Sequence, residues 1–195
     1  MSQRPSRPSI SVTDPRTLRG LAHPLRVRIL GALRLHGPST ATLLGQRLAE
    51  SSGATSYHLR ELHRFGFVED APDRGTGRER WWQAAHRSTS WSSTDFTGAG
   101  ATVADELQHW VVENRGRLLN AFLQQRGELP PEWTDISTFN DLPLHLTPAS
   151  AQRLADELTA LLLRWSDEEG EEPGTSGTMV VNVFADVAVL REYPL

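Results

Sequence analysis

The chain has 195 residues, of which 38% are hydrophobic, so it can form a core and is not a wholly disordered protein. It contains no cysteine, which excludes disulfides, thiolate metal sites and cysteine catalysis, and favours a reducing, cytoplasmic location. No apolar run approaches the roughly 20 residues of a membrane span. Residues 1–13 begin with prolines, serines and arginines and lack the apolar core of a signal peptide, so we expect a short disordered arm.

Charge is distributed unevenly along the chain. Residues 1–90 hold 14 arginines against seven acidic residues, a balance of +7. Residues 91–195 hold six arginines against 17 acidic residues, a balance of −11. This asymmetry indicates that the first half binds a polyanion and that the second half has another task.

Three helices are predicted after the arm. Asp14 is a good N-cap before Pro15, and together they begin a helix through residue 22. A second helix, residues 24–36, has an apolar stripe and ends at a Gly-Pro pair. Ser39 or Thr40 can cap a third helix that runs through residue 48 or 49.

A fourth helix and a hairpin follow. The helix is predicted over residues 54–65, with Gly66 as the residue that ends it. Two short β-capable runs, 67–70 and 78–82, flank a turn rich in Gly, Pro and Asp, which is typical of a hairpin. The order of helices and hairpin predicts a winged helix-turn-helix over residues 14–87. The predicted fold class is mainly α with a small β wing (α+β).

The rest of the chain is predicted to be largely helical. Residues 88–99 are rich in Ser, Thr and Gly and are expected to form a linker. Two amphipathic helices are predicted, at about 102–126 and 148–165, followed by an acidic loop at 167–177. The run Val180–Phe184 is predicted to be a strand. We therefore expect residues 100–195 to form a helical dimerisation and effector region that ends in a strand.

The segment from Leu21 to Trp82 resembles the ArsR-like winged-helix repressors. The resemblance is carried by the runs at 21–30, 52–62 and 65–68, and it covers about a third of the chain. The C-terminal half is similar to the helical extension of some actinobacterial-type members. The resemblance implies a dimeric, DNA-binding transcription regulator, usually a repressor that an effector releases. The alternative is an adaptor that keeps the winged fold, binds protein and does not read DNA.

The residues of the fourth helix support DNA binding independently. At about 100° per residue, Leu59 and Leu62 face inward while the arginines face outward, as in a helix that enters the major groove. Arginines on the hairpin are placed to reach the adjacent DNA backbone or minor groove. The candidate DNA-binding residues are Ala54, Ser56, Tyr57, His58, Arg60 and Arg64 on the helix, and Arg74, Arg78 and Arg80 on the hairpin.

One winged domain reads few base pairs, so we expect a homodimer on a palindromic duplex site. The candidate interface comprises the apolar stripe at 103–122, the helix at 148–165 and the first helix, although these surfaces can equally bury one another within one chain. The chain has six tryptophans, which suit either an apolar ligand cavity or a plain hydrophobic core.

Catalysis and metal binding are not expected. No glycine-rich phosphate loop or Gly-x-Ser-x-Gly elbow is present. Asp105, His109 and Glu113 are spaced four apart, but they lie away from the apolar stripe, where an ordinary solvated face is the better interpretation. We predict no metal, no other cofactor and no enzymatic activity.

Overall fold

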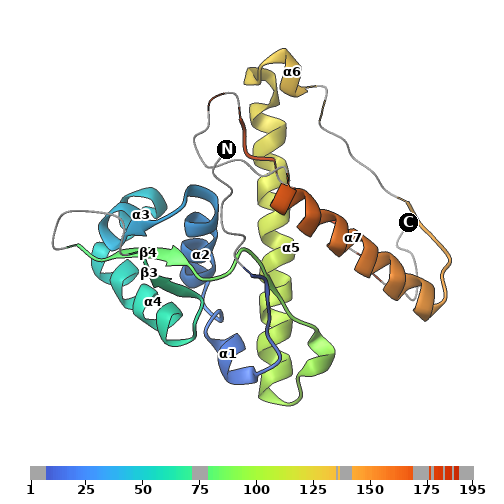
Figure 1. The fold of residues 1–195 in the computed structure, drawn as a ribbon, viewed down its shortest axis with the longest axis horizontal. Coiled ribbons are helices and arrows are strands. Elements are labelled where there is room, and N and C mark those ends of the chain that lie inside the picture. The colour runs from blue at the N-terminus through green and yellow to red at the C-terminus, as the bar shows by residue number, and fades with distance from the viewer. Residues whose placement is uncertain are drawn as a thin grey trace. The chain divides into compact units, whose positions relative to one another are not determined.

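The computed structural model describes residues 8–71, 79–134, 136, 142–168, 176, 178–181, 183–185 and 187–188. The chain divides into two units, Met1–Asn114 and Arg115–Leu195. Figure 1 shows the order of the elements along the chain. The predicted fold class is confirmed, because the first unit combines helices with a small antiparallel sheet.

Each of the first three helices begins after an N-cap residue whose side chain accepts a hydrogen bond from a backbone N–H of the first turn. Helix α1 (Pro15–Arg19) is capped by Asp14, whose carboxylate accepts a hydrogen bond from the Thr17 backbone N–H at 2.9 Å. Helix α2 covers Pro24–His36, as predicted. Helix α3 covers Ala41–Leu48 and is capped by Thr40. The side chains of α2 that form the core are Leu25, Ile29, Leu30, Ala32 and Leu33.

Helix α4 covers Ser52–Arg64 and begins two residues before the predicted start, because Ser51 accepts a hydrogen bond from the Ala54 N–H at 3.1 Å and acts as the N-cap. It packs against α2 and α3 in the first unit (Figure 1). The turn between α3 and α4 contains Ala49 in the left-handed conformation, with a φ of 56°. This compact turn sets α4 across α3.

The sheet of the wing has three strands in the order β2–β4–β3. Strands β3 (Val68–Asp70) and β4 (Trp81–Ala84) form the predicted hairpin, although β4 lies a few residues further along the chain than expected. Strand β2 (Ser39–Thr40) pairs with β4, with Thr40 opposite Trp81. Strand β2 was not predicted from the sequence. Because it directly precedes α3 and pairs with β4, it ties the start of α3 to the wing.

The predicted arm and linker are wrong where the structure describes them. Ile10–Ser11 (β1) and Thr89–Ser90 (β5) form a parallel pair. Val12 is buried, and so is Phe96, which follows the short 3-10 helix η1 (Ser93–Asp95). Apolar side chains and strand pairing thus hold both segments on the winged domain. Residues 1–7 lie outside the described part.

Arg34 of α2 holds the segment that leads into β5. Its Nε donates to the His86 carbonyl at 3.0 Å, and its Nη2 donates to the Thr89 hydroxyl at 2.6 Å. Burial lowers the pKa of Arg34 to about 10. Because a buried guanidinium needs hydrogen-bond acceptors, Arg34 fixes residues 86–89 to the helices.

The long helix α5 covers Ala99–Gln125. In the first unit its buried residues are Gly100, Ala104 and Leu107, which join the core or pack beside it. A short 3-10 helix (Arg126–Glu128) and helix α6 (Pro131–Thr134) follow it.

In the second unit, helix α7 covers Pro148–Glu168, three residues beyond its predicted end. The predicted strand at Val180–Phe184 is not formed by residues 180–181 and 183–184, which pair with no strand in the described part of the chain. A strand needs a neighbouring strand to hydrogen-bond with. The Phe184 ring lies against the Arg115 guanidinium of α5, with 5.6 Å between the guanidinium carbon and the ring centre.

The close approach of α3 to the turn before α4 leaves no room at Gly45. A Cβ there would lie 2.8 Å from the Glu50 backbone oxygen. We expect Gly45→Ala to lower the free energy of unfolding by about 1–3 kcal/mol, as overpacked core substitutions do. Urea denaturation measures this change.

Gly31 supplies the matched control. It is exposed on α2, and a Cβ there would meet nothing within 4 Å. Gly31→Ala should raise the free energy of unfolding by up to about 1 kcal/mol, because alanine restricts the unfolded chain and favours helix. Equal effects of the two substitutions would contradict the packing described at Gly45.

Candidate nucleic-acid interface

One side of α4 is fixed inside the protein. Thr55, Leu59 and Leu62 are fully buried. The Thr55 hydroxyl donates to the Ala41 carbonyl at 2.7 Å, which joins the first turn of α4 to the first turn of α3. These contacts set the rotation of α4 about its axis.

The opposite side of α4 is open to solvent. Tyr57 is 55% exposed, and Arg60 and Arg64 are exposed as well. Arg64 has only a long contact of 3.9 Å with Glu61, one turn away, so its guanidinium is barely neutralised. Arg60 makes no ion pair with any residue that the structure describes. The predicted outward face of the helix therefore presents two arginines and a tyrosine.

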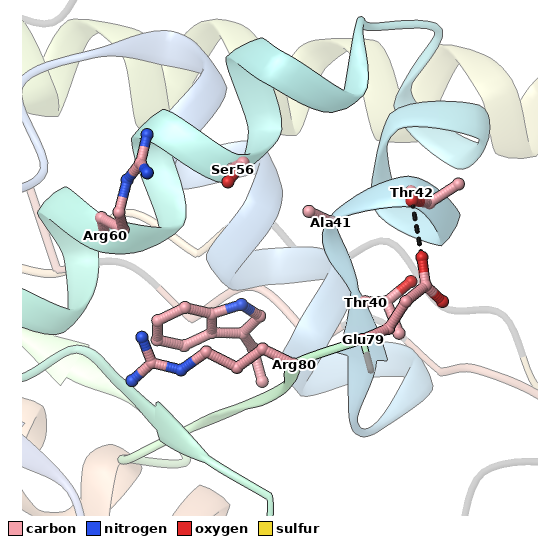
Figure 2. A pocket seen from close by; sticks show the side chains of 8 residues that line it. Thr40, Ala41, Thr42, Ser56, Arg60, Glu79 and Arg80 are labelled. Carbon is pink, nitrogen blue, oxygen red and sulfur yellow. Dashed lines mark hydrogen bonds between the residues drawn. The ribbon is translucent and has the colours of Figure 1, made fainter. Parts of the chain in front are cut away.

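A groove of about 290 Å³ lies beside this face. It is enclosed by the start of α3, by α4 and by the beginning of β4 (Figure 2). Its lining residues are Thr40, Ala41, Thr42, Ser56, Arg60, Glu79, Arg80 and Trp82. Ser56, Arg60 and Arg80 were candidates from the sequence, and the structure brings these three together.

Arg80 is held in place from two sides. Its Nε donates to one carboxylate oxygen of Asp70, and its Nη2 donates to the other at 2.8 Å. Its guanidinium also lies over the Trp82 indole, 3.9 Å from the ring centre. The hydrogen bonds from Arg80 lower the pKa of Asp70, so the carboxylate stays charged and offsets the charge of Arg80.

Trp82 also connects the wing to α4. Its indole is buried, and the His63 ring meets it edge-on at 5.4 Å between ring centres. The Trp82 side chain of the wing strand thus packs against His63 of α4. The same indole also contacts the Arg80 guanidinium. This arrangement keeps Arg80 near Arg60.

Glu79 is the acidic residue in the groove lining. Its carboxylate accepts a hydrogen bond from the Thr42 hydroxyl at 2.9 Å (Figure 2). Neither Glu79 nor Thr42 is indicated by the sequence, because their proximity depends on the pairing of β2 with β4. Thr40 is recognisable from the sequence as an N-cap and so marks the start of α3. It does not indicate which residues of β4 pair with β2.

The remaining candidates are placed differently. Ala54 is half-buried in the first turn of α4. His58 is also half-buried. Its ring lies against the His23 ring, tilted by 37° and with 4.2 Å between ring centres, so it is turned toward the start of α2. Arg74 and Arg78 lie outside the described residues.

Three of the tryptophans differ in burial. Trp82 belongs to the core, Trp91 packs against it and Trp165 is exposed on α7. Among the described residues, no group of three or more His, Asp or Glu side chains is arranged to hold a metal ion. No helix in that part of the chain is long and apolar enough to cross a membrane.

Residues 21–71 match a family model described as a helix-turn-helix domain, and the matched residues run from just after α1 to just after β3. The fold is a winged helix-turn-helix. The family match supports a DNA-binding transcription regulator, whereas the ArsR-like subfamily is not specifically indicated. No curated protein matches the chain.

Three solved structures are similar to the chain at low identity. A mutant of ZitR from Lactococcus lactis in its apo form has 15% identity and a TM-score of 0.32, and the match covers 77% of this chain and 88% of that one. RV1404 from Mycobacterium tuberculosis has 19% identity and a TM-score of 0.32, with 82% and 84% covered. A mutant of MarR from E. coli has 18% identity and a TM-score of 0.31, with 77% and 88% covered.

The surroundings of His58 make the stability of the winged helix-turn-helix sensitive to acid. Burial lowers the pKa of His58, and the neighbouring His23 and Arg26 lower it further, against the opposing effect of Glu50 and Glu61. The folded protein therefore binds this proton less tightly than the unfolded chain, whose histidine titrates near 6.5. The contribution to stability is complete above that pH and is lost as the pH falls below it.

Chemical denaturation between about pH 7.5 and about pH 5 measures this effect. His58→Gln should lose less stability over that interval than the unmodified chain does. His109→Gln, which removes an exposed histidine of α5, is the control and should follow the unmodified chain. Parallel curves for all three proteins would contradict the assignment to His58.

Proposed function

We propose that the chain is a sequence-specific, double-stranded DNA-binding transcription regulator. The observation that carries the proposal is the exposed face of α4, with Tyr57, Arg60 and Arg64, on a helix whose other side is locked into the core. A helix presented in this way fits the major groove, and the adjacent wing fits the flanking backbone. The helix-turn-helix match over residues 21–71 supports the same function.

The candidate residues divide into two roles under this proposal. Tyr57 and Ser56, near the start of α4, are closest to base edges. Arg60, Arg64 and Arg80 contact guanine or phosphate, together with Arg74 and Arg78 from the wing. His58 supports the helix on its inner side through its ring contact with His23. Ala54 lies beside them and allows close approach because its side chain is small.

We further propose that the chain acts as a homodimeric repressor on a palindromic operator and that a small-molecule effector releases it. The second unit supports dimerisation, because apolar side chains remain exposed on the second half of α5 and on α7. They are Leu118, Leu119, Leu123, Leu161 and Trp165. Burying such a surface against a second copy removes it from water.

The arginine face is tested by removing one charge at a time. Arg60→Ala and Arg64→Ala should each weaken binding to a random-sequence duplex and lower the salt dependence of binding by about one unit, because one phosphate contact is lost. Fluorescence anisotropy at several salt concentrations measures both quantities.

Arg153→Ala provides the matched control, because it removes one exposed arginine from α7 in the second unit. It should leave both the affinity and the salt slope close to those of the unmodified chain. Failure of the unmodified chain to bind duplex DNA at low salt would contradict the proposal and favour the protein-binding adaptor.

Dimerisation is tested on α5. We expect the unmodified chain to sediment as a dimer and Leu123→Asp to sediment as a monomer with an unchanged circular dichroism spectrum, since the side chain is exposed. The monomer should also bind a palindromic duplex more weakly, because two linked half-site contacts become one. A chain that sediments as a monomer at all concentrations would exclude this role for the second unit.

A further inference from the structure

Glu79 occupies a position that is unfavourable for DNA binding. It lines the groove between the start of α3, α4 and β4, which is the groove that Arg60 and Arg80 also line. Phosphates bind where cations and hydroxyl donors converge, and a carboxylate at the same place repels them. The presence of Glu79 there therefore needs an explanation.

The charges of the described residues at the groove offset one another. Arg80 is paired with Asp70 by two hydrogen bonds, so its charge is already offset. Arg60 is the guanidinium in the groove lining that has no acidic partner among the described residues, and Glu79 is the opposing carboxylate. An approaching phosphate thus meets little net attraction in this groove.

The contact of Glu79 with Thr42 is of the kind that a phosphate could replace. The Thr42 hydroxyl donates to a Glu79 carboxylate oxygen at 2.9 Å, and a phosphate oxygen accepts the same hydrogen bond. Both side chains are exposed, so Glu79 can leave without opening the core. Glu79 directly precedes Arg80 and lies just before β4.

We propose that Glu79 competes with DNA phosphate for this groove and is displaced from Thr42 when duplex DNA binds. This inference rests on the proposed function. The attraction between the protein and phosphates is independent of sequence, so a built-in carboxylate lowers the affinity for random DNA. Only sites that add favourable base contacts to α4 then become highly occupied.

The test replaces Glu79 by glutamine, which has the same shape and can still accept a hydrogen bond from Thr42. Glu79→Gln should bind a random-sequence duplex about five- to tenfold more tightly at low salt, as expected for removing one screened repulsive charge. The salt dependence should become steeper by about one unit. Fluorescence anisotropy measures both changes.

Glu69→Gln is the matched control. Glu69 is an exposed residue of the same hairpin, it accepts a hydrogen bond from Gln83 at 2.9 Å, and it does not line the groove. The substitution changes the net charge by the same amount. Equal tightening by the two variants would show a general charge effect and overturn the proposal. Weaker binding of Glu79→Gln would do the same, because Glu79 would then be a contact to DNA.

A second measurement separates this inference from the proposed function. Inorganic phosphate is titrated into the unmodified chain and into Glu79→Gln, and the backbone amide resonance of Thr42 is followed by NMR. It should shift at a lower phosphate concentration in Glu79→Gln, whether or not either protein binds duplex. Identical titrations would overturn the competition at Thr42. Failure of both proteins to bind duplex would instead contradict the proposed function.

Discussion

The arrangement of the candidate interface depends on the burial of one side of α4. Thr55, Leu59 and Leu62 are fully buried, and the Thr55 hydroxyl donates a hydrogen bond to the Ala41 carbonyl of α3. Because each helical residue turns the side-chain direction by about 100°, fixing these three also fixes Tyr57, Arg60 and Arg64 on the solvent side. Rotating the helix by one residue would bring charged side chains toward the core, where an unpaired charge is very costly. The core therefore determines which surface of α4 is exposed to solvent.

The pairing of β2 with β4 is the second constraint. It places Thr40 opposite Trp81 and so brings the start of α3 next to the first residues of the wing strand. The groove follows from that register, because Thr42 and Glu79 then come within hydrogen-bond distance. Trp82 adds to the connection, because its indole contacts both the His63 ring of α4 and the Arg80 guanidinium. The wing and the helices thus share a boundary on which polar groups are set in defined positions.

The sequence predicts those features that arise from local chemistry. Capping residues such as Asp14 and Thr40, and the apolar spacing of α2, indicate the helices within a few residues of their bounds. The parallel pair β1–β5 joins residues about 80 positions apart, and its strands are two residues long, so no local pattern indicates it. The same reason explains why Ser56 and Arg60 of α4 were predicted while Thr42 and Glu79 were not. The outward face of a helix can be derived from its period, whereas contacts across a groove depend on strand register.

The first unit also contains a route by which events at the start of α5 can affect α4. Ala104 and Leu107 of α5 share the hydrophobic cluster with Ile29 and Leu33 of α2, and α2 packs directly on α4. Arg34, near the end of α2, donates hydrogen bonds to residues 86 and 89 in the segment that leads toward α5. Close-packed cores deform little, so a displacement of the start of α5 has to be accommodated by α2 or by loss of these contacts. Packing alone therefore connects the start of α5 to the position of α4.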